Sequence, residues 1–165
     1  MHLVTSLAEE AYERELFKLQ GRSISEVEYV ELEGRGDALR ACDSDDFESL
    51  DYGFEWRLDT GVRCSFIWAW EFMKQKVSFS HESLTLFGRH WDATERWRRR
   101  GMIETRIVRV EVDWLTALDP AMHRYPQCVY VHFESGASIH VAARDDVNEP
   151  AESHLLTTFF VAAHR

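Results

Sequence analysis

Two pairs of segments alternate apolar and polar residues with a period of two, as β-strands with one buried face do. The first pair covers residues 54–58 and 62–68, and the second pair covers residues 129–133 and 137–141. A three-residue loop that ends in glycine separates the members of each pair. Such a loop suits a type I turn followed by a left-handed bulge, where glycine is least strained. The pattern therefore predicts two β-hairpins.

The length of these loops also predicts the register of each hairpin. With three loop residues, Trp56 pairs with Cys64 and Val131 pairs with Ile139, so apolar residues share one face. A two-residue loop would place core positions opposite polar ones, and we reject it. In the predicted register Cys64 points toward the core, which favours a packing role over a nucleophilic one.

Each hairpin is flanked by further predicted strands. One strand precedes each hairpin, at residues 24–32 and 107–114. A β-type segment follows each hairpin, at residues 83–87 and 155–161. The strand at 107–114 alternates most clearly, and its apolar side carries Val108, Val110, Val112 and Trp114.

A helix is predicted ahead of the strands in each half. Ser6 followed by Glu9 forms a capping box for the first helix, and Gly21 suits its left-handed cap. The second helix covers residues 93–100, with Asp92 in place of the usual Ser or Thr at its start.

The fold class predicted from these elements is α+β, with two tandem α-β-β-β-β halves at residues 1–90 and 91–165. The repeated order indicates an internal duplication; the alternative is two unrelated meanders that share common hairpin chemistry. We expect antiparallel sheets covered by the two helices, because an uncovered apolar sheet face favours aggregation. The two halves are expected to form one compact, pseudo-symmetric domain.

Two long connections interrupt this pattern. Residues 33–52 are rich in Gly, Asp and Ser, and residues 115–127 contain Pro120 and Pro126. Recognition residues are often carried by loops on a rigid scaffold. The first connection is therefore a candidate binding segment.

The net charge of −10 is unevenly distributed along the chain. Residues 26–59 hold twelve Asp and Glu against three Arg, whereas residues 89–109 hold seven Arg against three acids. A concentrated acidic surface repels nucleic acid and attracts basic partners. The alternative is a solvated surface that only keeps the protein soluble. The candidate partner-binding residues are Glu31, Glu33, Asp37, Asp43, Asp45, Asp46, Glu48 and Asp51.

The arginines at residues 96–100, beside Trp91 and Trp97, raise a nucleic-acid alternative, since Arg and Trp can clamp phosphates and stack on bases. Arginines in the last turn of a helix also complement its dipole, and these can pair with the chain's own acidic segment. The isoelectric point near 5.2 argues against nucleic-acid binding.

The second hairpin carries a weaker candidate site. Tyr130 is predicted opposite His140 and His132 opposite Ser138, which leaves the two histidines as diagonal neighbours. With Glu134 nearby, the histidines could hold a metal or act as an acid/base pair. An ordinary solvated sheet face is the simpler interpretation.

The composition is that of a globular protein, with 45% hydrophobic and 13% aromatic residues. The cysteines, Cys42, Cys64 and Cys128, lack the spacing of a zinc site or a disulfide framework. The N-terminus lacks the features of a signal peptide, and the apolar stretch 66–70 is too short to cross a bilayer. We therefore expect a cytoplasmic protein without a cofactor.

Common catalytic motifs, such as a GxSxG elbow or a P-loop, are absent from the sequence. The leading hypothesis is a non-enzymatic acidic binding protein, such as an inhibitor or immunity protein that neutralises a basic toxin. The alternative is a metal-dependent or small-molecule enzyme, or a ligand-binding protein. It would use the His132/His140 face or an aromatic cleft between the halves, floored by Trp56, Trp68 and Trp70. Self-association through the sheet is a third hypothesis.

Overall fold

The computed structural model describes residues 2–31, 47–50, 52–71, 74–84, 88–115, 125–144 and 154–160. Its elements, in chain order, are α1 (His2–Phe17), β1 (Ile24–Glu31), β2 (Phe47–Leu50), β3 (Gly53–Leu58), β4 (Arg63–Glu71), β5 (Lys74–Ser80), β6 (Arg89–Asp92), α2 (Thr94–Arg99), β7 (Ile107–Leu115), β8 (Tyr125–Phe133), β9 (Ser138–Arg144) and β10 (His154–Phe160).

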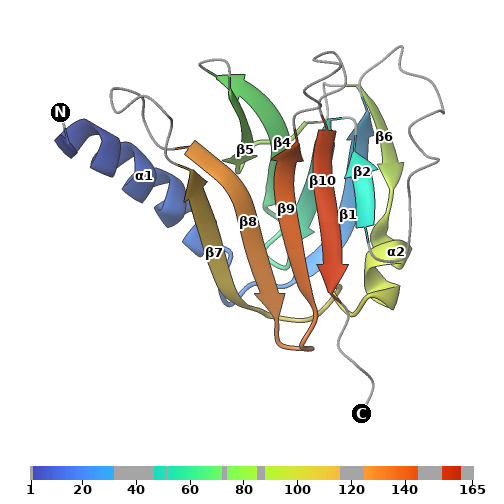
Figure 1. The fold of residues 1–165 in the computed structure, drawn as a ribbon. Helices are drawn as coiled ribbons and strands as arrows, with labels where there is room; N and C mark the ends of the chain where they lie inside the picture. Colours follow the sequence, from blue (N-terminus) through green and yellow to red (C-terminus); the bar gives the residue numbers. More distant parts are fainter. Residues whose placement is uncertain are drawn as a thin grey trace.

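The strands form two five-stranded sheets, with the orders β5-β4-β3-β1-β6 and β2-β10-β9-β8-β7. Every paired strand is antiparallel to its neighbour. The two sheets face each other, with α1 at one end of the pair and α2 at the other (Figure 1). The predicted α+β class with antiparallel sheets agrees with this architecture.

We predicted that the helices cover the apolar faces of the sheets. In the structure, the two sheets mainly cover each other's apolar faces. Trp56 and Phe66 of the first sheet belong to the same buried cluster as Val131 and Ile139 of the second. Aromatic rings fill much of it; for example, the ring centroids of Trp56 and Phe66 are 4.9 Å apart. Because α2 has only six residues, it cannot cover a five-stranded sheet, whereas a second sheet can.

Strand β2 lies in the second sheet, although its neighbours in the chain, β1 and β3, lie in the first. It follows β1 in the chain, but it pairs with β10 at the edge of the second sheet, where Glu48 lies opposite Thr157. The predicted boundary after residue 90 falls inside β6, which pairs with β1. The internal duplication and the division at residues 90–91 stay predictions.

Both predicted hairpins are confirmed. Trp56 pairs with Cys64 between β3 and β4, and Val131 pairs with Ile139 between β8 and β9. The glycine that ends each loop has the left-handed conformation that the bulge requires: φ is +82° at Gly61 and +87° at Gly136.

The strand predicted at 83–87 is misplaced. The structure has β5 at Lys74–Ser80, and residues 83 and 84 lie outside any strand, while 85–87 lie outside the described residues. Val77 and Phe79 alternate along β5 and pair with Trp68 and Phe66 of β4, which continues the meander.

A bulge corrects the predicted apolar side of the strand at 107–114. The register of β7 with β8 shifts between Ile107 and Arg109, so Val108 is the extra residue. Its side chain is 49% exposed, whereas Ile107 and Val110 are buried in the core. Strict alternation cannot reveal such an insertion.

The helix boundaries differ in part from those predicted. Helix α1 begins at His2, so Ser6 lies inside it and the predicted capping box is wrong. Gly21 has a φ of +82°, but it follows the helix end by four residues, and its N–H donates to Ile107 O at 2.8 Å. The N-cap of α2 is Ala93 and not Asp92 as predicted, although Asp92 accepts a hydrogen bond from the Thr94 N–H, at 2.9 Å.

Candidate functional site

The predicted acidic docking residues lie mostly between β1 and β2. Glu33, Asp37, Asp43, Asp45, Asp46 and Asp51 lie outside the described residues. The segment that carries the first five of these acids begins after Glu31, at the end of β1, and ends before Phe47, at the start of β2. Because β1 and β2 belong to different sheets, both sheets anchor this segment.

Glu48 is buried, which corrects our prediction that it belongs to an external docking surface. It is 0% exposed, and its Oε1 accepts hydrogen bonds from Arg100 Nη1 and Nη2, each at 3.2 Å. Arg96 Nη1 lies 3.4 Å from the same oxygen. A buried carboxylate is tolerated only when cations and hydrogen-bond donors compensate its lost hydration, and these two arginines do so.

Two aromatic residues complete the surroundings of Glu48. The hydroxyl of Tyr29, on β1, donates to Glu48 Oε2, and the Trp97 Nε1–H of α2 donates to that hydroxyl at 2.8 Å. Burial raises the pKa of Glu48, and the charges of Arg100 and Arg96 oppose the rise. The cluster links β2 to the opposite sheet and to the helix end, which is a structural role.

Three of the arginines around α2 are paired with acids of the same chain. Besides the two that contact Glu48, Arg98 lies 2.9 Å from Glu95 and 3.2 Å from Glu104. These pairs account for arginines that raised the nucleic-acid alternative. The pairing with the acidic segment that we considered is therefore observed for Arg96 and Arg100, through Glu48, whereas Arg98 pairs with acids outside that segment.

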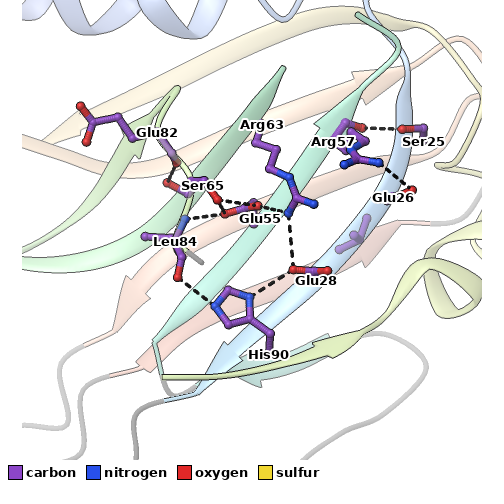
Figure 2. A network of polar contacts seen from close by, with 12 residues as sticks. Ser25, Glu26, Glu28, Glu55, Arg57, Arg63, Ser65, Glu82, Leu84 and His90 are labelled. Atoms are coloured by element: carbon purple, nitrogen blue, oxygen red, sulfur yellow. Dashed lines mark hydrogen bonds and ion pairs between the residues drawn. The ribbon is translucent and has the colours of Figure 1, made fainter. Parts of the chain in front are cut away.

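Three other acids of the 26–59 segment lie on the outer face of the first sheet, and our list of candidate residues omitted them. Glu26 and Glu28 are on β1 and Glu55 is on β3, where strand pairing places Glu28 opposite Glu55 (Figure 2). Glu26 pairs with Arg57 at 3.2 Å, and its side chain is 47% exposed. Arg57 and Arg63 partly balance the three acids of this face.

Glu55 is buried although it points away from the interior of the sandwich. It is 1% exposed, and Arg63 Nη1 lies 2.5 Å from its Oε1. Residues 82–84, which we call the strap, lie over this part of the outer face. The Leu84 N–H donates to Glu55 Oε2 at 2.6 Å, and the Ser83 hydroxyl donates to the same oxygen at 3.2 Å.

Further contacts hold the strap against the sheet. The Ser65 hydroxyl of β4 donates to the Glu82 carbonyl oxygen at 3.2 Å. His90 of β6 contacts the Leu84 carbonyl oxygen through Nε2, at 2.9 Å, and Glu28 Oε2 through Nδ1, at 3.1 Å (Figure 2). The sequence places Glu55 on a polar face, but it gives no sign of the segment that covers it.

The histidines of the second hairpin do not form the metal site that we considered. His132 contacts Glu111 at 2.8 Å, and His140 stacks on Tyr130 with ring centroids 4.3 Å apart. Glu134 is exposed in the hairpin loop. Within the described part of the chain, no group of three His, Cys, Asp or Glu residues could hold a metal ion.

The structure does not support Trp56 as part of the floor of an aromatic cleft between the halves. Trp56 is 0% exposed and packs in the core, so it cannot line an open cleft. Trp68 is partly buried against the core and contacts Tyr52 edge-on. The side chain of Trp70 lies outside the described residues.

Among the described residues, no helix is both long enough and apolar enough to cross a membrane.

The comparisons with known proteins identify no relative. No protein-family model, no curated protein and no solved structure matches this chain.

Proposed function

We propose that this protein is a non-enzymatic binding protein whose acidic surface docks a basic protein, as an inhibitor or immunity protein docks a toxin. The observation that carries the proposal is the net charge of −10. Internal ion pairs cannot remove this surplus, because each pair cancels one negative charge with one positive charge. The excess carboxylates therefore need counterions or a cationic partner.

The distribution of charge indicates where such a partner would dock. Residues 32–46 carry five acids against two Arg, and the segment continues from β1, which bears Glu26 and Glu28 on its outer face. Arg96 and Arg100, in contrast, are engaged with the buried Glu48. The charge of the arginine-rich region at residues 89–109 is thus partly neutralised within the protein. In segment 32–46, the acids outnumber the arginines.

The class of partner follows from this electrostatic complementarity. Clustered negative charge speeds encounter with a positive surface and discriminates against acidic proteins and nucleic acids. Enzymes that act on phosphate groups present such positive surfaces around their active sites. A basic toxin of this kind, for example a nuclease, is the partner we propose.

The test is a comparison of the wild-type protein with a variant in which Asp43, Asp45 and Asp46 are changed to lysine. Glu48 is left unchanged because it is buried, so its reversal would disturb the fold. Both proteins are immobilised at low salt, and the proteins retained from an extract of the source cells are quantified by mass spectrometry. Each retained basic protein is then purified and titrated calorimetrically.

A matched control separates a local surface from overall charge. Glu10, Asp113 and Glu134 are exposed outside segment 32–46, and their change to lysine alters the net charge equally. We expect a basic protein that binds the wild type and the control but not the Asp43/Asp45/Asp46 variant. The proposal fails if all three proteins bind the same basic proteins equally.

A further inference from the structure

The strap at residues 82–84 is held at both of its ends, by helix α1 at one end and by strand β6 at the other. The residue before it, His81, lies 3.3 Å from the Glu15 carbonyl oxygen of α1 through its Nε2. At the other end, His90 Nε2 lies 2.9 Å from the Leu84 carbonyl oxygen. Between these points, buried Glu55 accepts hydrogen bonds from the strap. Closure of the strap therefore buries a carboxylate of the acidic outer face.

The two ring nitrogens of His90 both face groups that only accept hydrogen bonds. Nε2 faces a backbone carbonyl, and Nδ1 faces the Glu28 carboxylate at 3.1 Å. A neutral imidazole carries one N–H and can satisfy one of these acceptors, whereas a doubly protonated imidazolium satisfies both. The observed geometry thus matches the protonated ring.

We propose that His90 is a proton-dependent latch that joins the strap, through Leu84, to β1, through Glu28. Protonated His90 bridges the two elements. After loss of one proton, the remaining N–H stays on Nδ1, because the Glu28 carboxylate is a stronger acceptor than the Leu84 carbonyl. The lone pair of Nε2 then faces the Leu84 carbonyl oxygen, so His90 no longer holds the strap. A hydrogen bond from an imidazolium to a carboxylate is stronger than one between neutral groups, because both partners are charged.

Because of the charged groups around His90, loss of its proton affects the strap and leaves the ion pairs of the sheet in place. Glu28 of β1 is the carboxylate that touches the ring, and Arg63 of β4 lies 3.6 Å from that carboxylate. Arg63 also holds Glu55 of β3. When His90 is neutral, Arg63 still compensates both acids, so the sheet keeps its ion pairs. On its own strand, His90 is flanked within two residues by Arg89 and Asp92, which are exposed.

Opening of the strap would change the acidic face. Glu55 would become accessible beside Glu28, and the loss of the His90 proton would remove one positive charge from the same place. We therefore expect stronger attraction of a cationic protein when His90 is neutral than when it is protonated. This consequence rests on the proposed function, whereas the latch itself does not.

Amide hydrogen exchange of the isolated protein tests the latch directly. The Leu84 N–H is bonded to Glu55 only while the strap is closed, so its exchange rate reports on opening. We expect Leu84 exchange, divided by its intrinsic rate at each pH, to be roughly tenfold faster at pH 8 than at pH 5.5, as for loss of one charge-assisted hydrogen bond. Equal corrected rates at the two pH values would overturn the proposal.

Two variants assign the effect to His90. His90→Gln cannot bridge both acceptors in the same way, so Leu84 should exchange quickly at both pH values. His132→Gln is the matched control, because His132 is also a partly exposed histidine beside a carboxylate, Glu111, but on the other sheet. It should keep the wild-type pH dependence. A His90→Gln protein with the wild-type pH dependence would contradict the latch.

A third variant covers the case in which His90→Gln does not fold. Glu28→Gln keeps the ring and the strap but removes the carboxylate that favours a second proton on the ring. It should therefore weaken the pH dependence of Leu84 exchange. The exchange result needs no partner, so a failed search for a basic partner leaves it standing. A confirmed partner with pH-independent Leu84 exchange would refute the latch alone.

Discussion

Glu48 of β2 and Arg100, the residue that follows α2, form an ion pair with an N–O distance of 3.2 Å, although they are 52 residues apart in the chain. The Glu48 side chain is inaccessible to solvent, and that of Arg100 is 10% exposed. The pair holds a strand of the second sheet to the helix that closes one end of the sandwich (Figure 1). It therefore joins parts of the fold that are distant in the sequence.

Glu48→Ala is expected to destabilise the protein strongly. The change leaves Arg100 buried without its carboxylate, and breaking a buried pair in this way costs about 3–5 kcal/mol. Chemical denaturation, followed by tryptophan fluorescence, measures the loss. Glu95→Ala is the control, since it removes an exposed pair with Arg98 on the same helix and should cost below about 1 kcal/mol. Similar losses for both variants would contradict the structural role of Glu48.

The hairpins could be predicted because their information is local. Alternation specifies which residues of β3 and β4 share a face, and a loop that ends in Gly61 specifies their register. Strand β2 could not be predicted in this way. It has only four residues, and a glutamate points inward, so its pattern opposes burial until Arg100 compensates the charge. That compensation is a long-range contact, which periodicity does not reveal.

Gly88→Ala is expected to be more harmful than Gly61→Ala. Both glycines have positive φ, so each alanine incurs a backbone cost of about 1–2 kcal/mol. A Cβ at Gly61 meets open space, but a Cβ at Gly88 would overlap the Glu31 carbonyl oxygen. Urea unfolding of the two variants therefore isolates the steric cost at the end of β1. Equal losses would show that this close approach is absent.

Asp92 is expected to make stability depend on acid pH. Hydrogen bonds from the Thr94 side chain and backbone N–H lower the pKa of Asp92. Because the folded-state value lies below the unfolded one, the stabilisation is present at neutral pH. It is lost as the pH falls through about 3.9 and down to the folded-state value.

Asp92→Asn should remove that part of the acid sensitivity and cost about 1 kcal/mol or less at pH 7, as for the weakening of one hydrogen bond at the surface. Asp59→Asn is the control, because Asn also suits a hairpin turn. Urea midpoints between pH 3 and pH 7 measure the difference. An unchanged pH profile in Asp92→Asn would exclude a role for this carboxylate.

Cys64 is expected to resist alkylation in the native protein. It is buried in the core, and burial raises the pKa of its thiol to about 12. Since the thiolate is the reactive form, iodoacetamide at pH 8 should modify Cys64 only when the protein unfolds. Peptide mass spectrometry after a short pulse, with and without denaturant, measures this protection. Rapid labelling of Cys64 in the folded protein would contradict the core position.

The candidate site was only partly accessible to sequence reasoning. The count of charges along the chain identified the acidic segment. It also indicated that arginines of the second helix could pair with that segment, as Arg100 does with Glu48. It did not distinguish buried acids from exposed ones. Glu48 and Glu55 have the same side chain as Glu26, but their burial depends on Arg100 and on the strap, which come from distant segments.

The salt dependence of association with a basic partner tests the central claim most directly. Stopped-flow fluorescence gives the association rate constant of the wild type and of the Asp43/Asp45/Asp46-to-lysine variant from 50 to 300 mM salt. We expect the wild-type rate to fall by roughly tenfold across this range, because salt screens electrostatic attraction. The variant should associate slowly throughout. A wild-type rate that does not change with salt, or that equals the variant's rate at low salt, would contradict docking through the acidic surface.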